Sequence, residues 1–126
     1  MVTNQLAAEL EAPVIDLEAL KARCLGNLDL VDRVLAKFTG QVDADLDEFD
    51  RAINDRNSAK AAQLAHRIKG IAGSVEARRL YADAAQAEQR ALENRLADLP
   101  DDLIRMRGDR SQLDQTLLHS KMLATT

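Results

Sequence analysis

The sequence predicts an all-α fold, an antiparallel up-and-down four-helix bundle with a short N-terminal capping helix. Aromatic residues make up only 2 % of the 126 residues, whereas sheets favour aromatic and β-branched side chains. Apolar residues recur at helical spacing over long stretches, and long helices joined by short connections pack up and down. Both prolines, Pro13 and Pro100, lie where an element would begin or end.

The N-terminal part of the chain divides into a tail and the start of the folded domain. Residues 1–13 are predicted to form a tail, and residues 14–123 a single helical domain. Asp16 is a residue type that caps helix starts, and Gly26 is one that ends helices. We therefore expect a short amphipathic helix over residues 16–25.

A long helix is predicted from about residue 28 to 55, because apolar residues recur there at alternating steps of three and four. Asn27 is a candidate cap for its start. Gly40 lies inside this helix, and Asp45 occupies a position that the repeat would make apolar. We therefore expect a bend or a solvent-facing turn near residues 40–45. The repeat consists of Val31, Leu35, Phe38, Val42, Phe49 and Ala52.

The following stretch, residues 58–75, is predicted to be a helix with two unlike faces. A tight turn, capped by Asn57 or the serine after it, makes this helix antiparallel to its predecessor. One face is apolar, whereas the other carries His66 among alanines and glycines where a solvated helix would carry long charged side chains. Gly70 and Gly73 each cost roughly 0.5–1 kcal/mol relative to alanine, and close approach of a partner is the predicted compensation. The apolar face comprises Ala61, Leu64, Ile68, Ile71, Ala72 and Val75, and the other face Ala59, Ala62, Gln63, His66, Lys69, Gly70 and Gly73.

Two further helices complete the predicted bundle. The first is expected to have about 20 residues and an alanine stripe that permits close packing. The last begins at Pro100, with Asp101 and Asp102 favourable in its first turn. Gly108 is a candidate break in it, and His119 is predicted to be structural or exposed. The two apolar seams are Leu80, Ala84, Ala87 and Ala91, and Leu103, Met106, Leu113 and Leu117.

The residues around His66 carry a motif, which reads AHRIKG followed by IAGS. It resembles the histidine-containing phosphotransfer (HPt) domain family, whose pattern is a histidine followed three residues later by lysine and four later by glycine. Lys69 and Gly70 match that spacing. The resemblance covers roughly residues 14–120 and is most specific over residues 64–75. The family's apolar positions are filled by Ala65, Ile68, Ala72 and Val75.

The resemblance implies roles for individual residues. His66 would be the phosphoacceptor, and Lys69 would stabilise the phosphoryl charge. A polar side chain midway along the next helix would lie near the histidine, a place that Glu88 or Gln89 fills. Where the family commonly has glycine, ten residues after the histidine, this chain has Glu76, which either strains the turn or begins the next helix. The expected partner-docking residues are Ala62, Gln63, Arg67, Gly70 and Gly73.

The resemblance also implies partners. Receiver domains of response regulators would stand on one or both sides of a relay, and a hybrid sensor histidine kinase would stand upstream. His66 would take a phosphoryl group from an aspartyl phosphate and pass it to another receiver. Magnesium is expected in the receiver, and no cofactor in this chain. Residues 58–79 carry five cations and one anion, and such a basic patch speeds encounter with an anionic partner.

Several other classes of function lack support in the sequence. There is no Gly-rich phosphate loop, no visible pair of acid and base, and no metal-ligand spacing. The chain would therefore be a phosphotransfer intermediate without its own ATP site. Whether such an intermediate counts as an enzyme stays open.

The net charge of −4 argues against a nucleic acid partner. Cys24, the single cysteine, is expected to pack as a small apolar residue. No apolar run approaches the roughly 20 residues that span a bilayer, and the start lacks the pattern of a signal peptide. We therefore expect a cytoplasmic protein. The sequence is compatible with a free-standing carrier and equally with a fragment of a larger kinase, and its net charge of −4 is compatible with the expected monomer.

A competing hypothesis is a helical adaptor or inhibitor that docks a receiver or a histidine kinase without being phosphorylated. It needs the same small-residue stripe and basic patch but not the imidazole of His66. A small helical enzyme or metal protein ranks last, because no second catalytic residue is visible.

Overall fold

The computed structural model describes the backbone of residues 14–124 and the side chains of residues 14–117. The tail predicted at residues 1–13 and the side chain of His119 lie outside the described residues. No strand occurs in the described part, so the all-α fold class is confirmed. None of the described helices is long and apolar enough to cross a membrane. The helices are α2 (Leu17–Arg23), α3 (Leu28–Asn54), α4 (Ser58–Ser74), α5 (Arg78–Leu92) and α6 (Leu99–Ala124), with a 3₁₀ turn at Leu96–Asp98.

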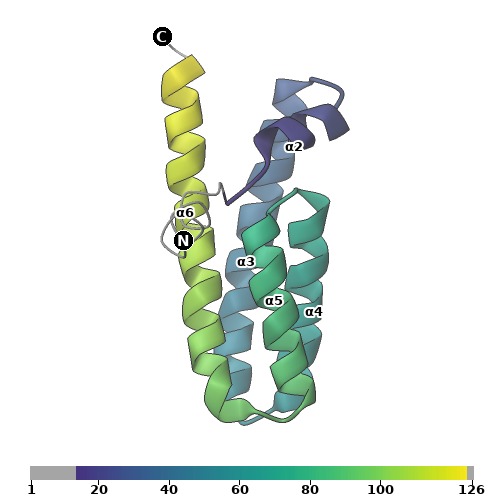
Figure 1. Cartoon of the computed structure of the whole chain (residues 1–126), viewed down its shortest axis with the longest axis vertical. Helices are drawn as coiled ribbons and strands as arrows, with labels where there is room; N and C mark the ends of the chain where they lie inside the picture. The colour runs from purple at the N-terminus through teal and green to yellow at the C-terminus, as the bar shows by residue number, and fades with distance from the viewer. Residues whose placement is uncertain (1–13, 125–126) are drawn as a thin grey trace, which may run out of the picture.

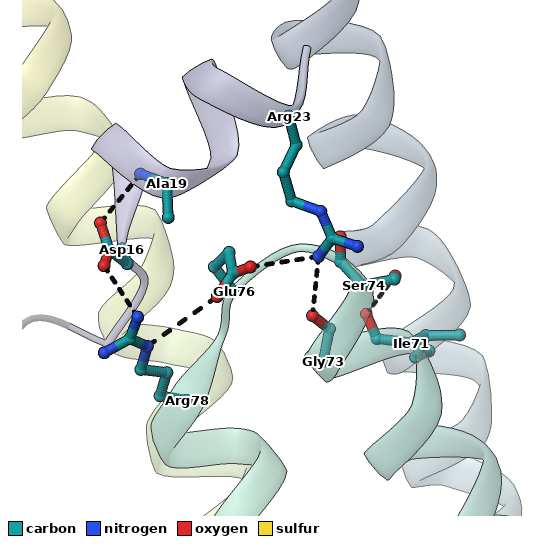
Figure 2. A network of polar contacts seen from close by, with 8 residues as sticks. All are labelled: Asp16, Ala19, Arg23, Ile71, Gly73, Ser74, Glu76 and Arg78. Atoms are coloured by element: carbon teal, nitrogen blue, oxygen red, sulfur yellow. Dashed lines mark hydrogen bonds and ion pairs between the residues drawn. The ribbon is translucent and has the colours of Figure 1, made fainter.

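The long helices alternate in direction along one common axis (Figure 1). Helix α4 packs against α3 and α5, and α6 packs against the same two helices. The short helix α2 lies across the end at which α4 turns into α5 (Figures 1 and 2). The apolar repeat of α3 is buried at every predicted position, and Cys24 is buried with a free thiol, as expected.

Side-chain caps fix three of the helix starts. Asp16, Asn27 and Asn57 each accept a hydrogen bond from the backbone N–H three residues later, at 3.0–3.1 Å. The predicted caps of α2 and α3 are therefore confirmed, and for α4 the asparagine rather than the serine is the cap. A cap of this kind stabilises a helix by about 1 kcal/mol.

The predicted solvent-facing turn near residues 40–45 is wrong. Helix α3 continues through Gly40, and Asp45 is only 1 % exposed. Arg67 on α4 compensates the buried charge, because its Nη2 lies 2.6 Å from Asp45 Oδ1 and its Nε lies 3.1 Å from Oδ2. Gln41 donates a further hydrogen bond to Asp45. A buried carboxylate is costly unless it is paired in this way, so Asp45 joins α3 to α4.

Glu76 lies in the turn between α4 and α5. Of the two predicted arrangements, a strained turn or the start of the next helix, the structure has the strained turn. The φ of Glu76 is +62°, a left-handed conformation that favours glycine. Polar contacts to the α2 segment offset that strain (Figure 2). The Glu76 carboxylate lies 3.1 Å from Nη1 of Arg23, and its carbonyl accepts the backbone N–H of Asp16 at 3.0 Å. Arg78 completes the network through an ion pair with Asp16 at 3.1 Å.

The last two helices differ from their predicted lengths. Helix α5 has 15 residues rather than about 20, because the chain turns at Asn94, whose φ is +59°. Asparagine tolerates that conformation better than most residues. The break predicted at Gly108 is wrong, since α6 runs through it uninterrupted. Met106 and Leu113, which lie on either side of Gly108 in the sequence, are buried and hold the helix against the bundle.

Helices α5 and α6 meet at a pair of carboxyl groups. Asp109 on α6 is 7 % exposed. Burial, followed by the hydrogen bond to Asp83 on α5 and the charge of that carboxylate, raises the pKa of Asp109 to about 8, while Arg79 and Arg105 act in the opposite direction. The folded chain therefore holds a proton on Asp109 at neutral pH.

This proton makes stability depend on pH. At pH values between the ordinary pKa of 3.8 and the raised pKa of about 8, the unfolded chain has released the proton from Asp109 that the folded chain keeps. The contribution of Asp109 to the free energy of unfolding should therefore fall as pH rises, by up to about 1.4 kcal/mol per pH unit. Because Asn does not titrate, Asp109→Asn should gain stability relative to the wild type from about pH 5 to pH 8, as measured by urea unfolding.

The matched control is Asp101→Asn, at an exposed position of the same helix, which should follow the pH dependence of the wild type. An Asp109→Asn chain that also follows the wild type would contradict the assignment of the proton.

Candidate functional site

His66 lies on the exposed side of α4, and its side chain is 69 % exposed. The helical repeat places it opposite Leu64, Ile68 and Ala72, which are buried. Gln63 and Gly70, one turn away on either side, are exposed as well. A Cβ added to Gly70 would meet no atom within 4 Å, so the space beside the imidazole is open.

Two residues of the predicted small-residue face lie elsewhere than expected. Ala62, predicted as a docking residue, is buried, with 6 % of its surface exposed, rather than on the open face. The reason is that α4 packs against helices on two sides, which widens its buried face beyond the apolar stripe. Gly73 is half-buried against α5, where an added Cβ would lie 3.3 Å from the ring of Tyr81. An intramolecular contact therefore accounts for this glycine.

The site centres on the carboxylate of Glu88, which α5 brings next to α4. Its Oε2 lies 2.7 Å from His66 Nδ1, and its Oε1 lies 2.7 Å from Lys69 Nζ. Gln89, the other candidate, instead donates a hydrogen bond to Glu93. Of the two residues predicted near the histidine, the structure thus brings Glu88 to it and not Gln89.

The charges of this cluster reinforce one another. The pKa of Glu88 is lowered, chiefly by the hydrogen bond from Lys69 and also by His66, although partial burial opposes the shift. The pKa of Lys69 is raised, chiefly by the hydrogen bond to Glu88. Glu88 is therefore a carboxylate and Lys69 a cation over the whole neutral range.

This charge state determines the tautomer of the imidazole. An ionised carboxylate can only accept hydrogen bonds, so His66 Nδ1 must donate its proton to Glu88. In the neutral ring the other nitrogen, Nε2, then carries the free electron pair. Nε2 has no hydrogen-bond partner among the described residues. The arrangement therefore presents one oriented nucleophile to solvent, with a cation one turn away.

Arg67, a predicted docking residue, is held on the α3 side of the helix. The hydrogen bond with Asp45 is the largest cause of its raised pKa, and Glu48 lies 3.5 Å away. Sequence reasoning missed Asp45 as its partner. The signal was present, because a carboxylate at an apolar position of a helical repeat requires a cation from a neighbouring element.

Comparisons with known proteins agree with the motif. A protein-family model described as the Hpt domain matches residues 33–119. This range includes α4 and α5 and therefore His66, Lys69 and Glu88. Neither the search of curated proteins nor that of solved structures gave a match. Within the described residues, no group of three or more His, Cys, Asp or Glu could hold a metal ion.

The arrangement predicts that Glu88 controls the imidazole tautomer. In the wild type, neutral His66 should carry its proton on Nδ1, because only that proton reaches the carboxylate. In Glu88→Ala this preference should be lost, and a larger Nε2–H fraction should appear in the ¹⁵N chemical shifts of the ring. Gln89→Ala changes the adjacent residue and should leave the ring signals unchanged. Identical ring shifts in Glu88→Ala and the wild type would show that the carboxylate does not hold the ring.

Proposed function

Because the chain belongs to the Hpt domain family, whose members act in histidine phosphotransfer of two-component signalling, we propose that it is a phosphoryl carrier in a phosphorelay and that His66 is its phosphoacceptor. The observation that carries the proposal is the imidazole held by Glu88, whose Nε2 has no partner among the described residues and lies in an open part of α4. Receiver domains of response regulators are the proposed partners on both sides of the relay, with a hybrid sensor histidine kinase upstream.

The proposed transfer begins with neutral His66 and an aspartyl phosphate of the receiver. Nε2 attacks the phosphorus, the N–P bond forms, and the P–O bond to the aspartyl group breaks. The receiver's carboxylate leaves with the electron pair. The imidazole becomes cationic in this step, and the carboxylate at Nδ1, 2.7 Å away, stabilises that charge. Magnesium, which we expect in the receiver, would supply charge neutralisation from the partner's side.

Lys69 is the proposed electrostatic partner of the phosphoryl group. Its ammonium lies one turn from His66 and is anchored to the same carboxylate. A side chain of this length can remain near Glu88 or move to the phosphoryl oxygens, where its charge opposes theirs. The reverse sequence of steps passes the group to a second aspartate.

The proposal also assigns roles to the rest of the chain. The four long helices would form an up-and-down bundle within a domain of residues 14–123, with α2 as its cap. Exposed Gln63 and Gly70 would contact the receiver. We propose that the chain works as a cytoplasmic monomer.

The direct test is incubation with a phosphorylated receiver domain from the same organism, followed by intact-mass measurement. One acid-labile phosphoryl group should appear on the wild type and on His119→Gln, and none on His66→Gln. Circular dichroism should show that all three are folded. Receiver binding without any phosphoryl gain by the wild type would favour the adaptor hypothesis instead.

Lys69→Ala should accept phosphate about ten- to a hundredfold more slowly, on the rough scale of 1.4–2.7 kcal/mol for one charge contact in the transition state. Lys69→Arg, which keeps the charge, should restore part of the rate. Lys60→Ala removes an exposed lysine of the same helix and serves as the matched control. Equal single-turnover rates for Lys69→Ala and Lys60→Ala would remove the role given to Lys69.

A further inference from the structure

The turn between α4 and α5 carries a side chain that links three helices. The carboxylate of Glu76 lies between the guanidinium groups of Arg23 on α2 and Arg78 on α5 (Figure 2). One carboxylate oxygen is 3.1 Å from Arg23 Nη1, and the other is 3.9 Å from Arg78 Nε. Arg23 Nη1 also contacts the backbone carbonyls of Gly73 and Ser74, at 3.3 and 3.1 Å. Because these two carbonyls belong to the end of α4, Glu76 and Arg23 together connect α2, α4 and α5.

The left-handed backbone of the turn does not by itself require this link. Arg56 has a φ of +56° in the turn between α3 and α4, close to the +62° of Glu76. In both turns the backbone N–H of the next residue donates a hydrogen bond at 2.9 Å to a carbonyl in the last turn of the preceding helix. The side chain of Arg56 is exposed and makes no hydrogen bond or ion pair within the described residues. The polar contacts of the Glu76 side chain therefore have a role besides closing a turn.

The α2 segment provides a fixed base for these contacts. Ile15 and Leu20 are each 1 % exposed and anchor the segment in the core. The backbone N–H of Asp16 donates to the Glu76 carbonyl at 3.0 Å, and the Asp16 carboxylate pairs with Arg78 at 3.1 Å. The segment thus contacts both the turn and the start of α5.

Apolar packing leaves space at this corner of the bundle. A cavity of about 210 Å³ lies beside the turn, and its lining includes Gly73, Glu76, Arg78 and Tyr81. The ring of Tyr81, in the first turn of α5, rests against Gly73, where an added Cβ would lie 3.3 Å from the ring. Interiors that fix side chains by packing alone contain few such spaces. The polar contacts of Glu76 are therefore what holds the first turn of α5 in place against α4.

The first turn of α5 in turn determines the direction of Glu88. Tyr81 and Glu88 are seven residues apart, close to two helical turns, so they lie on the same face of α5. That face is directed at α4, since Tyr81 contacts Gly73 and Glu88 Oε2 lies 2.7 Å from His66 Nδ1. A rotation of α5 about its axis would move both side chains together and would turn Glu88 away from the imidazole.

We propose that Glu76 is a positioning residue for the phosphotransfer site, because its links to α2 and α5 fix the rotation of α5 that directs Glu88 at His66. The inference rests on the proposed function. It also gives the α2 segment a role beyond that of a cap, since Arg23 holds the turn from which α5 starts.

The test uses Glu76→Gly, which removes the carboxylate while glycine adopts the left-handed φ without strain, so the turn itself is kept. The ¹⁵N chemical shifts of the His66 ring should show a larger Nε2–H fraction than in the wild type. The single-turnover rate of phosphoryl acceptance from a phosphorylated receiver should fall roughly three- to tenfold, since the carboxylate of Glu88 is displaced and not removed. Circular dichroism and urea unfolding should show a folded chain.

Arg56→Gly is the matched control, because it places glycine at the left-handed position of the other turn. It should leave the ring shifts and the rate of phosphoryl acceptance unchanged. Arg23→Ala breaks the link from the α2 side and should act like Glu76→Gly. Glu76→Gln keeps an oxygen that accepts a hydrogen bond from Arg23 and should restore part of the rate.

The outcomes separate this inference from the function on which it rests. Ring shifts and rates equal to those of the wild type in both Glu76→Gly and Arg23→Ala, while the wild type is phosphorylated on His66, would overturn the positioning role and leave the carrier function standing. An equal change in Arg56→Gly would also overturn it, because any loosened turn would then have the same effect. A wild type that accepts no phosphate from any receiver would overturn the carrier function, and the positioning role with it.

Discussion

The close packing of α4 against α5 is the constraint on which the site depends. Both helices bury alanines, including Ala65 on α4 and Ala84 and Ala87 on α5, and small residues let two helix axes approach toward about 8 Å. Because the two helices pack closely, the side chain of Glu88 reaches both His66 and Lys69. Larger residues in the alanine stripe would move α5 away from α4 and lengthen both 2.7 Å contacts.

Helix α4 is fixed by polar contacts on both flanks, and these differ in kind. On the α3 side, the buried carboxylate of Asp45 is matched by Arg67, a pair whose main consequence is the register of two helices. On the α5 side, Glu88 is less deeply buried and is shared by the ammonium of Lys69 and the imidazole of His66. The first pair sets where His66 stands, and the second sets which ring nitrogen faces solvent. We propose that phosphotransfer requires both.

The sequence was most informative where one physical signal dominated. Helical periodicity and the caps at Asp16 and Asn27 predicted the elements, and the spacing around His66 predicted the family. It was less informative where two signals competed. Asp45 broke an apolar repeat, and its partner, 22 residues away, had no local signature. The helical repeat assigned Ala62 and Gly73 to the open face of α4, but neighbouring helices cover them. This burial follows from the packing of α4 between two helices, which the repeat alone does not reveal. The choice between Glu88 and Gln89 likewise depends on how α5 is rotated about its own axis. The apolar periodicity does not determine that rotation to within a single residue.

In the proposed mechanism, Glu88 holds the Nδ1 proton of His66 and thereby makes Nε2 the phosphoacceptor atom. It is tested most directly by the nitrogen to which phosphorus is bonded, read from ³¹P and ¹⁵N NMR spectra of the phosphorylated, ¹⁵N-histidine-labelled chain. We expect a single phosphohistidine at Nε2 of His66, with Nδ1 still protonated and hydrogen-bonded to Glu88. Phosphorylation at Nδ1 would contradict it, because that atom faces the carboxylate of Glu88 in the structure.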